Sequence, residues 1–156
     1  MRNLDSTDLA LLDLLQQDAK LTHKELADRL HLSTTPVFER VKRLEREGYI
    51  LGYAALVDRQ KLGLGLMAFC DVLLKEHQTA YLQRFEQDVR TLPEVVACYH
   101  IAGQFDYLLQ VVAPDMAAYQ RFITQKLAAL DHIGRVQSSF VMTEVKRQGE
   151  GPMAAV

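Results

Sequence analysis

The chain has 156 residues, with 18 Lys and Arg against 20 Asp and Glu, and a formal net charge of −2 at pH 7. An apolar fraction of 49% and a charged fraction of 24% are typical of a globular protein, and the charge balance excludes a nonspecific polycation. We see no apolar run near the length of about 18 residues that spans a membrane and no signal-peptide pattern. Cys70 and Cys98 lie in apolar runs, so we predict two reduced core thiols in a cytoplasmic protein without a membrane partner.

The first third of the chain predicts three short helices. Residues 4–18 form the first, with Asp5 as its N-cap and an inward stripe of Leu11, Leu12 and Leu15. The second begins at Thr22, because a hydroxyl residue followed three positions later by Glu25 is a capping box. A polar turn over residues 31–33 then leads to the third helix.

The third helix, predicted from about residue 35 to residue 47, carries two different faces. Pro36 suits its first turn and Gly48 is placed to end it in a left-handed conformation. Residues recurring every three positions predict an apolar face of Phe38, Val41 and Leu44, and the other side carries the cations Arg40, Lys42, Arg43 and Arg46. Two helices joined by a tight turn, the second with hydroxyls at its start and cations along it, suit the DNA major groove.

The next stretch predicts a wing and a linker. Residues 49–57 are apolar and favour a strand or a wing hairpin, which makes residues 1–57 a winged helix-turn-helix domain. Residues 58–65 are charged or polar and then glycine-rich, and we predict a linker there. Basic and acidic side chains are nearly balanced over residues 1–60, so a DNA-binding surface requires cations to segregate locally.

The second half changes to alternating strand patterns and helical patterns. In chain order we predict strand 66–75, helix 79–90, strand 94–102, turn 103–106, strand 107–113, a helix from the N-cap Asp115 to about residue 130, and strand 135–146. This β-α-β-β-α-β order is ferredoxin-like, so the fold class is α+β, with a ferredoxin-like domain over residues 66–147 and a flexible tail over residues 148–156.

The predicted sheet has helices on one face only, yet its strands are apolar on both faces. The first strand alternates Met67, Phe69 and Leu73 with an equally apolar second set. Such a strand is expected to be covered on both sides. A second copy of the chain is the simplest cover, so we predict a homodimer.

Motifs along the chain match those of a known family. They include Leu4-Asp5, Leu26-Ala27, residues 39–45, Gly103-Gln104-Phe105-Asp106-Tyr107 and Glu144-Val145-Lys146. In this order they resemble the Lrp/AsnC, or feast/famine, family of transcriptional regulators. The resemblance implies a DNA-binding winged helix-turn-helix, a domain for amino-acid sensing and assembly, and dimers that stack into octamers.

Candidate DNA contacts cluster at the second and third helices. Hydroxyls at a helix N-terminus can bond phosphates, and cations along the helix can contact bases or phosphates. The alternative is a solvated, salt-bridged helix face, since acids alternate with the cations. The full candidate set is Thr22, His23, Ser33, Thr34, Thr35, Pro36, Glu39, Arg40, Lys42, Arg43 and Arg46.

The turn over residues 103–106 is the candidate effector site. Gly103 permits close backbone approach, so amides can bind a carboxylate, and the Asp106 carboxylate can accept from an ammonium group. An ordinary hairpin turn is the alternative. The resemblance places the effector, expected to be an amino acid, here between dimers, and the candidate residues are His100, Ala102, Gly103, Gln104, Phe105, Asp106, Ser138 and Ser139.

Other functions remain open from the sequence. The chain has no spacing of His and Cys that suits a metal, and no nucleotide-binding or triad motif, so we expect no metal, no cofactor and no enzymatic activity. Two alternatives stand beside the regulator. One is an enzyme resembling sirohaem decarboxylases, with His100 or Tyr107 as catalytic groups, and the other is an effector-independent nucleoid-associated protein.

Overall fold

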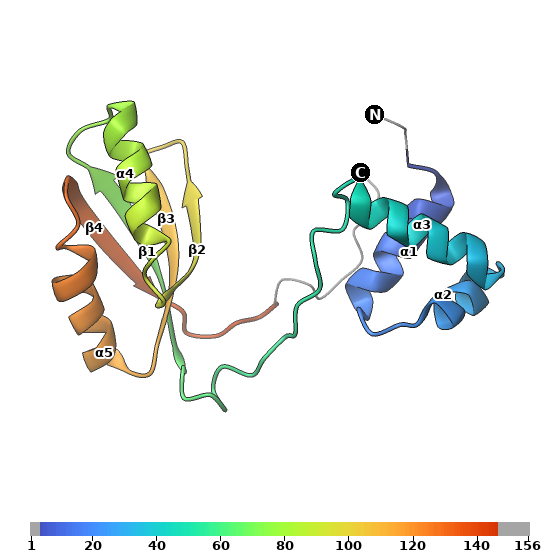
Figure 1. The fold of residues 1–156 in the computed structure, drawn as a ribbon. Coiled ribbons are helices and arrows are strands. Elements are labelled where there is room, and N and C mark those ends of the chain that lie inside the picture. The colour runs from blue at the N-terminus through green and yellow to red at the C-terminus, as the bar shows by residue number, and fades with distance from the viewer. Residues whose placement is uncertain (1–3, 147–156) are drawn as a thin grey trace. The chain divides into compact units, whose positions relative to one another are not determined.

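The computed structural model describes residues 4–146 (Figure 1). They form two compact units, one of residues 4–56 with residues 145–146 and the other of residues 57–144. The flexible tail predicted over residues 148–156 lies outside the described part of the chain. Each unit has its own hydrophobic core, so each is described separately below.

The first unit contains three helices, α1 (Ser6–Gln17), α2 (His23–Leu30) and α3 (Thr34–Arg46). Both predicted N-caps are confirmed, and each is part of a capping box: Asp5 with Asp8, and Thr22 with Glu25. The three helices pack around one small core, made of Leu11, Leu15, Leu26, Ala27, Val37, Val41 and Leu44.

The inward face of α3 differs from the prediction by one residue. Val37, not Phe38, packs beside Val41 and Leu44, and Phe38 stays exposed. Side chains three or four residues apart both lie on one face of a helix. The spacing of apolar residues in the sequence therefore did not decide whether Val37 or Phe38 faces the core.

The end of α3 follows the prediction. Gly48 adopts φ +77°, and its amide bonds the Glu45 carbonyl while the Tyr49 amide bonds the Leu44 carbonyl. These two bonds form a Schellman motif, which requires a left-handed residue where Gly48 stands.

The strand or wing hairpin predicted over residues 49–57 is wrong. Residues 51–57 adopt no regular structure, and their backbone pairs with no other segment among residues 4–146. A strand is stabilised by a neighbour, and the described part of this chain supplies none. The helical part of the winged helix-turn-helix is therefore present, whereas the predicted strand is not.

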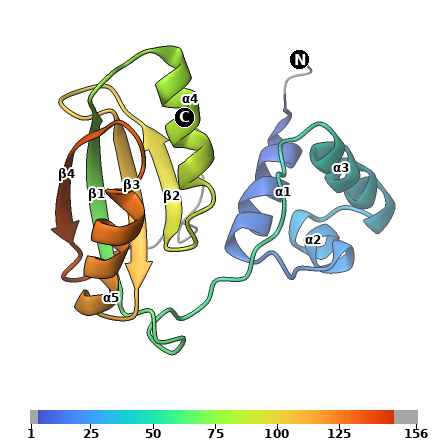
Figure 2. The same cartoon turned by 60° about the vertical axis from the view of Figure 1, so that its left-hand side comes forward.

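The second unit has the predicted β-α-β-β-α-β order. Its elements are β1 (Leu66–Leu74), α4 (Thr79–Val89), β2 (Val95–His100), β3 (Tyr107–Ala113), α5 (Met116–Arg121), the π-helical η1 (Phe122–Leu127) and β4 (Ile133–Phe140). The strands form one antiparallel sheet in the order β2-β3-β1-β4, which is the ferredoxin-like topology. Figure 2 shows α4 and α5 on the same side of this sheet.

The core of the second unit lies between the sheet and its helices. Ala68, Cys70, Val72 and Leu74 of β1 are buried there, together with the alternate residues of β3 from Tyr107 to Ala113. The opposite face of β1 is only partly buried, with Met67, Phe69 and Leu73 accessible. Among residues 4–146, β1 is therefore covered on one face rather than two.

Three details of the second unit correct the sequence analysis. The helix predicted to run from Asp115 to about residue 130 changes to π-helical hydrogen bonding at Phe122, for which we have no physical account. The last strand ends at Phe140 because its partner β1 begins at Leu66, so residues 141–146 have little left to pair with. Cys70 is a buried free thiol as predicted, but Cys98 lies on the edge strand β2 and is exposed.

Candidate DNA-binding and effector-binding sites

The N-terminus of α3 presents a row of hydroxyls that have no hydrogen-bond partner among residues 4–146. Ser33 is the N-cap, yet its side chain makes no capping hydrogen bond. Thr34 and Thr35 fill the first two helical positions and Pro36 the third, and all four residues are exposed. The amides of a first helical turn have no partner within the helix, so this end can donate both amides and hydroxyls to a phosphate.

Arg40 and Arg43 point to α1 instead. The Arg40 Nη1 atom lies 2.6 Å from Asp5 Oδ2 and 2.7 Å from Asp8 Oδ1, and Arg43 Nη2 lies 2.6 Å from Asp8 Oδ2. Asp8 is only 1% exposed, so its charge depends on these two guanidinium groups. The predicted contact of Arg40 and Arg43 with bases or phosphates therefore competes with a structural role of both side chains that the sequence did not reveal.

The two arginines remain partly accessible. The side chain of Arg40 is 30% exposed and that of Arg43 is 26% exposed. The hydrogen bond from Arg40 to Asp5, followed by that to Asp8, raises the pKa of Arg40, and the pKa of Asp5 is lowered by the Asp8 amide and then by Arg40. We call the group of Asp5, Asp8, Arg40 and Arg43 the α1–α3 ion cluster.

The other DNA-contact candidates divide into free and engaged side chains. Glu39 and Arg46 are exposed and make no ion pair among residues 4–146. Lys42 is exposed and donates to Glu45 at 3.1 Å. The Thr22 hydroxyl is engaged in its capping box with Glu25, and the His23 ring contacts the Phe38 ring edge-on, with centroids 5.1 Å apart.

The turn between β2 and β3 has open backbone amides. The Ile101 amide donates to the Asp106 carbonyl and the Asp106 amide donates to the Val72 carbonyl, which fixes both ends of the turn. Between them, the amides of residues 102–105 donate to no acceptor in the described part of the chain. Gly103 has φ +150° and open space where a side chain would stand, so a ligand can approach this backbone closely.

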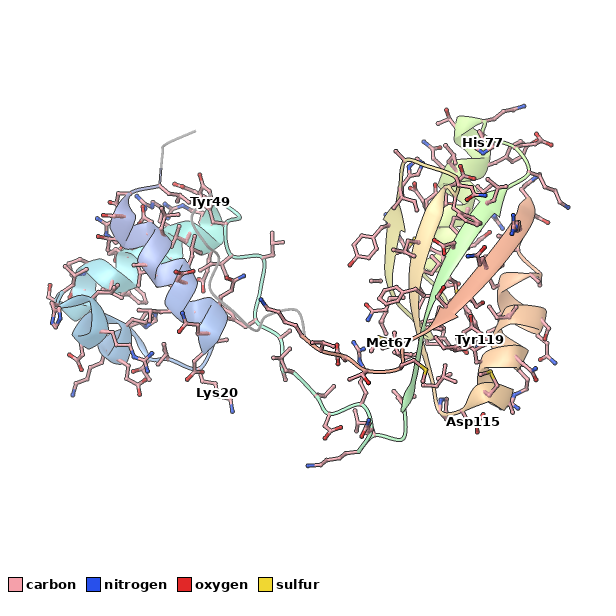
Figure 3. All side chains as sticks on the ribbon, turned by 180° about the vertical axis from the view of Figure 1, so that it is seen from behind. Lys20, Tyr49, Met67, His77, Asp115 and Tyr119 are labelled. Carbon is pink, nitrogen blue, oxygen red and sulfur yellow. The ribbon has the colours of Figure 1, made fainter. Side chains whose placement is uncertain are left out.

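The Asp106 carboxylate does not point into open space. Its Oδ2 atom accepts from the Leu74 amide at 2.7 Å, and His77 Nε2 lies 3.0 Å from Oδ1 and 3.1 Å from Oδ2. Figure 3 shows His77 in the loop that follows β1. Asp106 therefore holds the turn against the end of β1, and its role as an acceptor for an ammonium group stays a prediction.

The remaining effector candidates are not all brought to this turn. Arg135 at the start of β4 lies over the Phe105 ring, 5.8 Å from its centroid, whereas Ser138 and Ser139 pair with Cys70 and Phe69 farther along β1. The Ser138 hydroxyl accepts from Tyr119. Ala102 and Gln104 lie exposed in the turn itself.

Sequence reasoning missed two residues near the turn, His77 and Arg135. Arg135 could have been found, because it is a cation near the start of the final predicted strand. His77 lies in a loop whose sequence gave no comparable indication.

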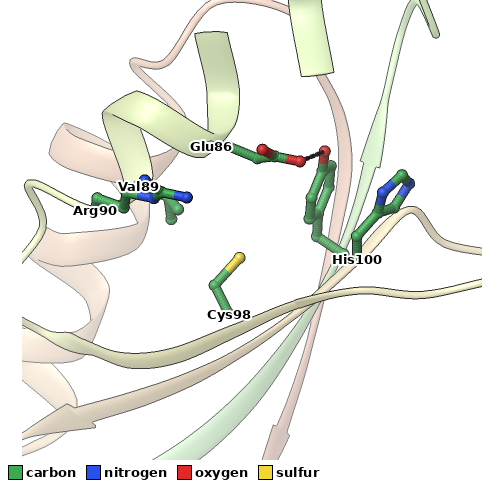
Figure 4. Close-up of a pocket in the computed structure, with 6 residues that line it drawn as sticks. Glu86, Val89, Arg90, Cys98 and His100 are labelled. Atoms are coloured by element: carbon green, nitrogen blue, oxygen red, sulfur yellow. Dashed lines mark hydrogen bonds between the residues drawn. The ribbon is translucent and has the colours of Figure 1, made fainter. Parts of the chain in front are cut away.

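His100 faces a small pocket between α4 and β2. The pocket has a volume of about 140 Å³ and is lined by Glu86, Val89, Arg90, Cys98, His100 and Tyr107 (Figure 4). The His100 ring stacks on Tyr107 with centroids 4.7 Å apart, and the Tyr107 hydroxyl donates to Glu86 at 3.1 Å. Burial, and then this bond, raise the pKa of Tyr107, so its hydroxyl stays protonated near neutral pH.

Residues 4–146 contain no cluster of three His, Cys, Asp or Glu side chains that could hold a metal ion. No helix in the same range is long and apolar enough to cross a membrane.

Comparison with known proteins assigns both units. A winged helix-turn-helix DNA-binding domain matches residues 4–50, and the Lrp/AsnC ligand binding domain matches residues 67–150. The chain belongs to the Lrp/AsnC family. It is thus a transcriptional regulator of the Lrp/AsnC type, with one domain that binds DNA and one that binds a ligand.

Several relatives of this Lrp/AsnC regulator align over nearly its whole length. The Bkd operon transcriptional regulator of Pseudomonas aeruginosa is 37% identical over 98% of this chain and 100% of its own. The transcriptional activator DecR of Escherichia coli is 40% identical over 92% of this chain and 94% of its own. A Neisseria meningitidis regulator, NMB0573, solved as a complex with L-Met, superposes with a TM-score of 0.92 at 37% identity, covering 97% of this chain and 98% of its own.

Proposed function

We propose that this Lrp/AsnC regulator binds specific DNA sequences through the N-terminus and outward face of α3, and that an amino acid bound at the 101–106 turn changes that binding. The observation that carries the DNA proposal is the row of exposed hydroxyls at Ser33, Thr34 and Thr35, none of which makes a hydrogen bond within the described chain. These groups stand where the α3 dipole attracts a phosphate.

Two exposed cations support the same surface. Lys42 and Arg46 lie on the exposed side of α3, away from the α1–α3 ion cluster. Phosphate contacts position a protein on the duplex without reading its sequence, so we assign this role to Lys42 and Arg46. Arg40 can contact DNA only where a phosphate takes the place of the exposed Asp5 carboxylate as a partner of its guanidinium group.

The effector proposal rests on the open amides of the turn. A free amino acid carries a carboxylate, and the amides of residues 102–105 are unpaired donors beside Gly103. Asp106 acts as a positioning residue there, because its carboxylate holds the Leu74 amide and His77. The L-Met complex of the Neisseria protein supports an amino acid as the ligand class.

The proposed assembly uses the sheet face that no helix covers. Tyr99 of β2 is 49% exposed on this face, and Met67, Phe69 and Leu73 of β1 are only partly buried there. Apolar area of this kind favours a symmetric contact with a second copy. We propose that two chains form a homodimer through this face and that such dimers assemble into octamers, with the effector held between dimers. We also propose that the protein has no enzymatic activity.

The test of the DNA proposal begins with selection of a bound sequence from a random DNA pool. Binding of the selected duplex is then measured by fluorescence anisotropy at several salt concentrations. The double variant Thr34→Ala and Thr35→Ala should weaken binding at least about tenfold, because each hydrogen bond to a charged phosphate is worth about 1.5–3 kcal/mol. Thr79→Ala is the matched control, since Thr79 is the first residue of α4 in the other unit.

Two results would count against this proposal. One is a protein that selects no sequence and shows no salt dependence, since phosphate neutralisation always gives a salt slope. The other is a double variant that binds as tightly as the Thr79→Ala control.

The effector proposal is tested by calorimetric titration of the twenty amino acids. An amino acid that binds should lose affinity in Gly103→Val, because a branched side chain at φ +150° strains the turn, and should shift the DNA dissociation constant of the parent protein. Absence of binding by all twenty would favour the effector-independent nucleoid-associated alternative.

A further inference from the structure

Phe38 is an aromatic side chain exposed in the middle of the helix that carries the DNA-binding face. Its side chain is 40% exposed, while Val37, Val41 and Leu44 occupy the core beneath α3. A single exposed apolar residue needs no explanation by itself. The surroundings of this one, however, are specific.

The Phe38 ring is fixed by two neighbours that belong to the candidate DNA surface. The His23 ring, at the start of α2, meets it edge-on with an interplanar angle of 77°, and the Lys42 ammonium lies 6.0 Å from its centroid. An ammonium group over an aromatic face is attracted to it. The ring is therefore held in place rather than free to fold back onto the protein.

Spacing puts Phe38 in line with two polar groups. Thr34, Phe38 and Lys42 are each four residues apart, so they form one stripe along α3. The stripe offers a hydroxyl, then an apolar ring, then a cation. With α3 in a major groove, the hydroxyl and the cation reach phosphates or polar base atoms, and the ring between them faces base edges.

An apolar ring discriminates among those edges in one way. In the major groove the base edges present hydrogen-bond donors and acceptors, and thymine alone adds an apolar C5-methyl group. A phenylalanine can neither donate nor accept, so it gains only by covering that methyl. We propose that Phe38 is a specificity-determining residue that selects thymine by contact with its methyl group, an inference that rests on the DNA-binding function proposed above.

The expected effect is small but measurable. Burial of one methyl-sized group corresponds to a change in affinity of about fourfold. A dimer that reads two half-sites applies this factor twice, which gives roughly fifteenfold for the paired replacement.

The experiment replaces thymines of the selected DNA, one at a time and in symmetric pairs, with deoxyuridine, which lacks only the methyl group. Wild-type protein should lose about fourfold in affinity at one position of each half-site. Phe38→Ala should bind the thymine duplex more weakly and should be indifferent to the replacement at that same position. Leu9→Ala, which removes an equally exposed side chain from α1, should retain the full sensitivity of the wild type.

Each other outcome has a definite meaning. If the wild-type protein selects a sequence but its affinity is unchanged by every replacement of thymine, the Phe38 proposal alone is overturned. Phe38 then serves only as a contact between α2 and α3. Equal methyl sensitivity in wild type and Phe38→Ala also overturns it. A wild-type protein that selects no sequence overturns the DNA-binding proposal, and the inference fails with it.

Discussion

Removal of the Asp8 carboxylate is expected to loosen the DNA-binding unit. Asp8→Ala eliminates the contacts of 2.7 Å to Arg40 and 2.6 Å to Arg43, together with the bond from the Asp5 amide that completes the capping box. Breaking a buried ion pair costs about 3–5 kcal/mol. We expect a loss near about 3 kcal/mol, at the low end of that range, because both guanidinium groups are partly exposed and can turn toward water.

Hydrogen exchange followed by mass spectrometry measures this loss in the full-length protein. A loss of about 3 kcal/mol accelerates exchange of the protected amides in α1 and α3 by roughly a hundredfold or more. Peptides from the sheet of the second unit serve as an internal reference. Asp28→Ala is the matched control, since Asp28 is an exposed carboxylate of α2 that makes no ion pair among residues 4–146.

The reasoning is refuted if Asp8→Ala exchanges like Asp28→Ala, within about 0.5 kcal/mol of the parent protein. That result would mean that Arg40 and Arg43 contribute nothing to the fold through Asp8. It would also restore both arginines to the set of candidates for direct DNA contact.

Three further predictions concern single sites. Gly103→Ala should lower the stability of the second unit by about 1 kcal/mol or more in thermal unfolding, because its φ of +150° is unfavourable for a side chain, whereas Gly65→Ala, also in open space, should have little effect. The pKa of Glu25 lies below its ordinary value of 4.5, chiefly because the Thr22 amide bonds its carboxylate. The stabilising contribution of its carboxylate is therefore complete above about pH 4.5 and is lost as the pH falls through the folded-state pKa. In Glu25→Gln, the stability measured by circular dichroism should therefore depend less on pH in the acid range. Cys98 is exposed as a residue, but it lines the pocket beside α4, and partial loss of water there, followed by the nearby Glu86, raises the pKa of its thiol to about 11. Its alkylation by iodoacetamide, followed by mass spectrometry, should therefore be slow at pH 8 and speed up about tenfold per pH unit.

Local signals predicted most of the fold. The N-cap Asp5, the capping box at Thr22, Gly48 after α3 and the strand Tyr107–Ala113 all depend on residues close in the chain, and all lie where the pattern indicated. The errors concern long-range partners. A strand over residues 49–57 needs a neighbour that no local pattern can supply.

In the candidate sites, too, local features were predicted and long-range partners were not. The hydroxyls at the start of α3 are exposed as the helix-turn-helix pattern implies. The partners of the Arg40 and Asp106 side chains lie 29 positions away or more. They are Asp5 and Asp8 for Arg40, and Leu74 and His77 for Asp106. A sequence gives the charge of such a side chain but not its neighbour, so an engaged residue and a free one look alike.

The two sides of α3 have separate tasks. Val37, Val41 and Leu44, with Arg40 and Arg43, attach the helix to the rest of its unit, whereas the hydroxyls, Phe38, Lys42 and Arg46 lie outside that attachment. Apart from Phe38, whose ring contacts His23 of α2, substitutions on the outer side are thus expected to be nearly neutral for folding. With the outer side in contact with DNA as proposed above, a duplicated copy of the gene is able to change its preferred DNA sequence one substitution at a time, without loss of the folded state.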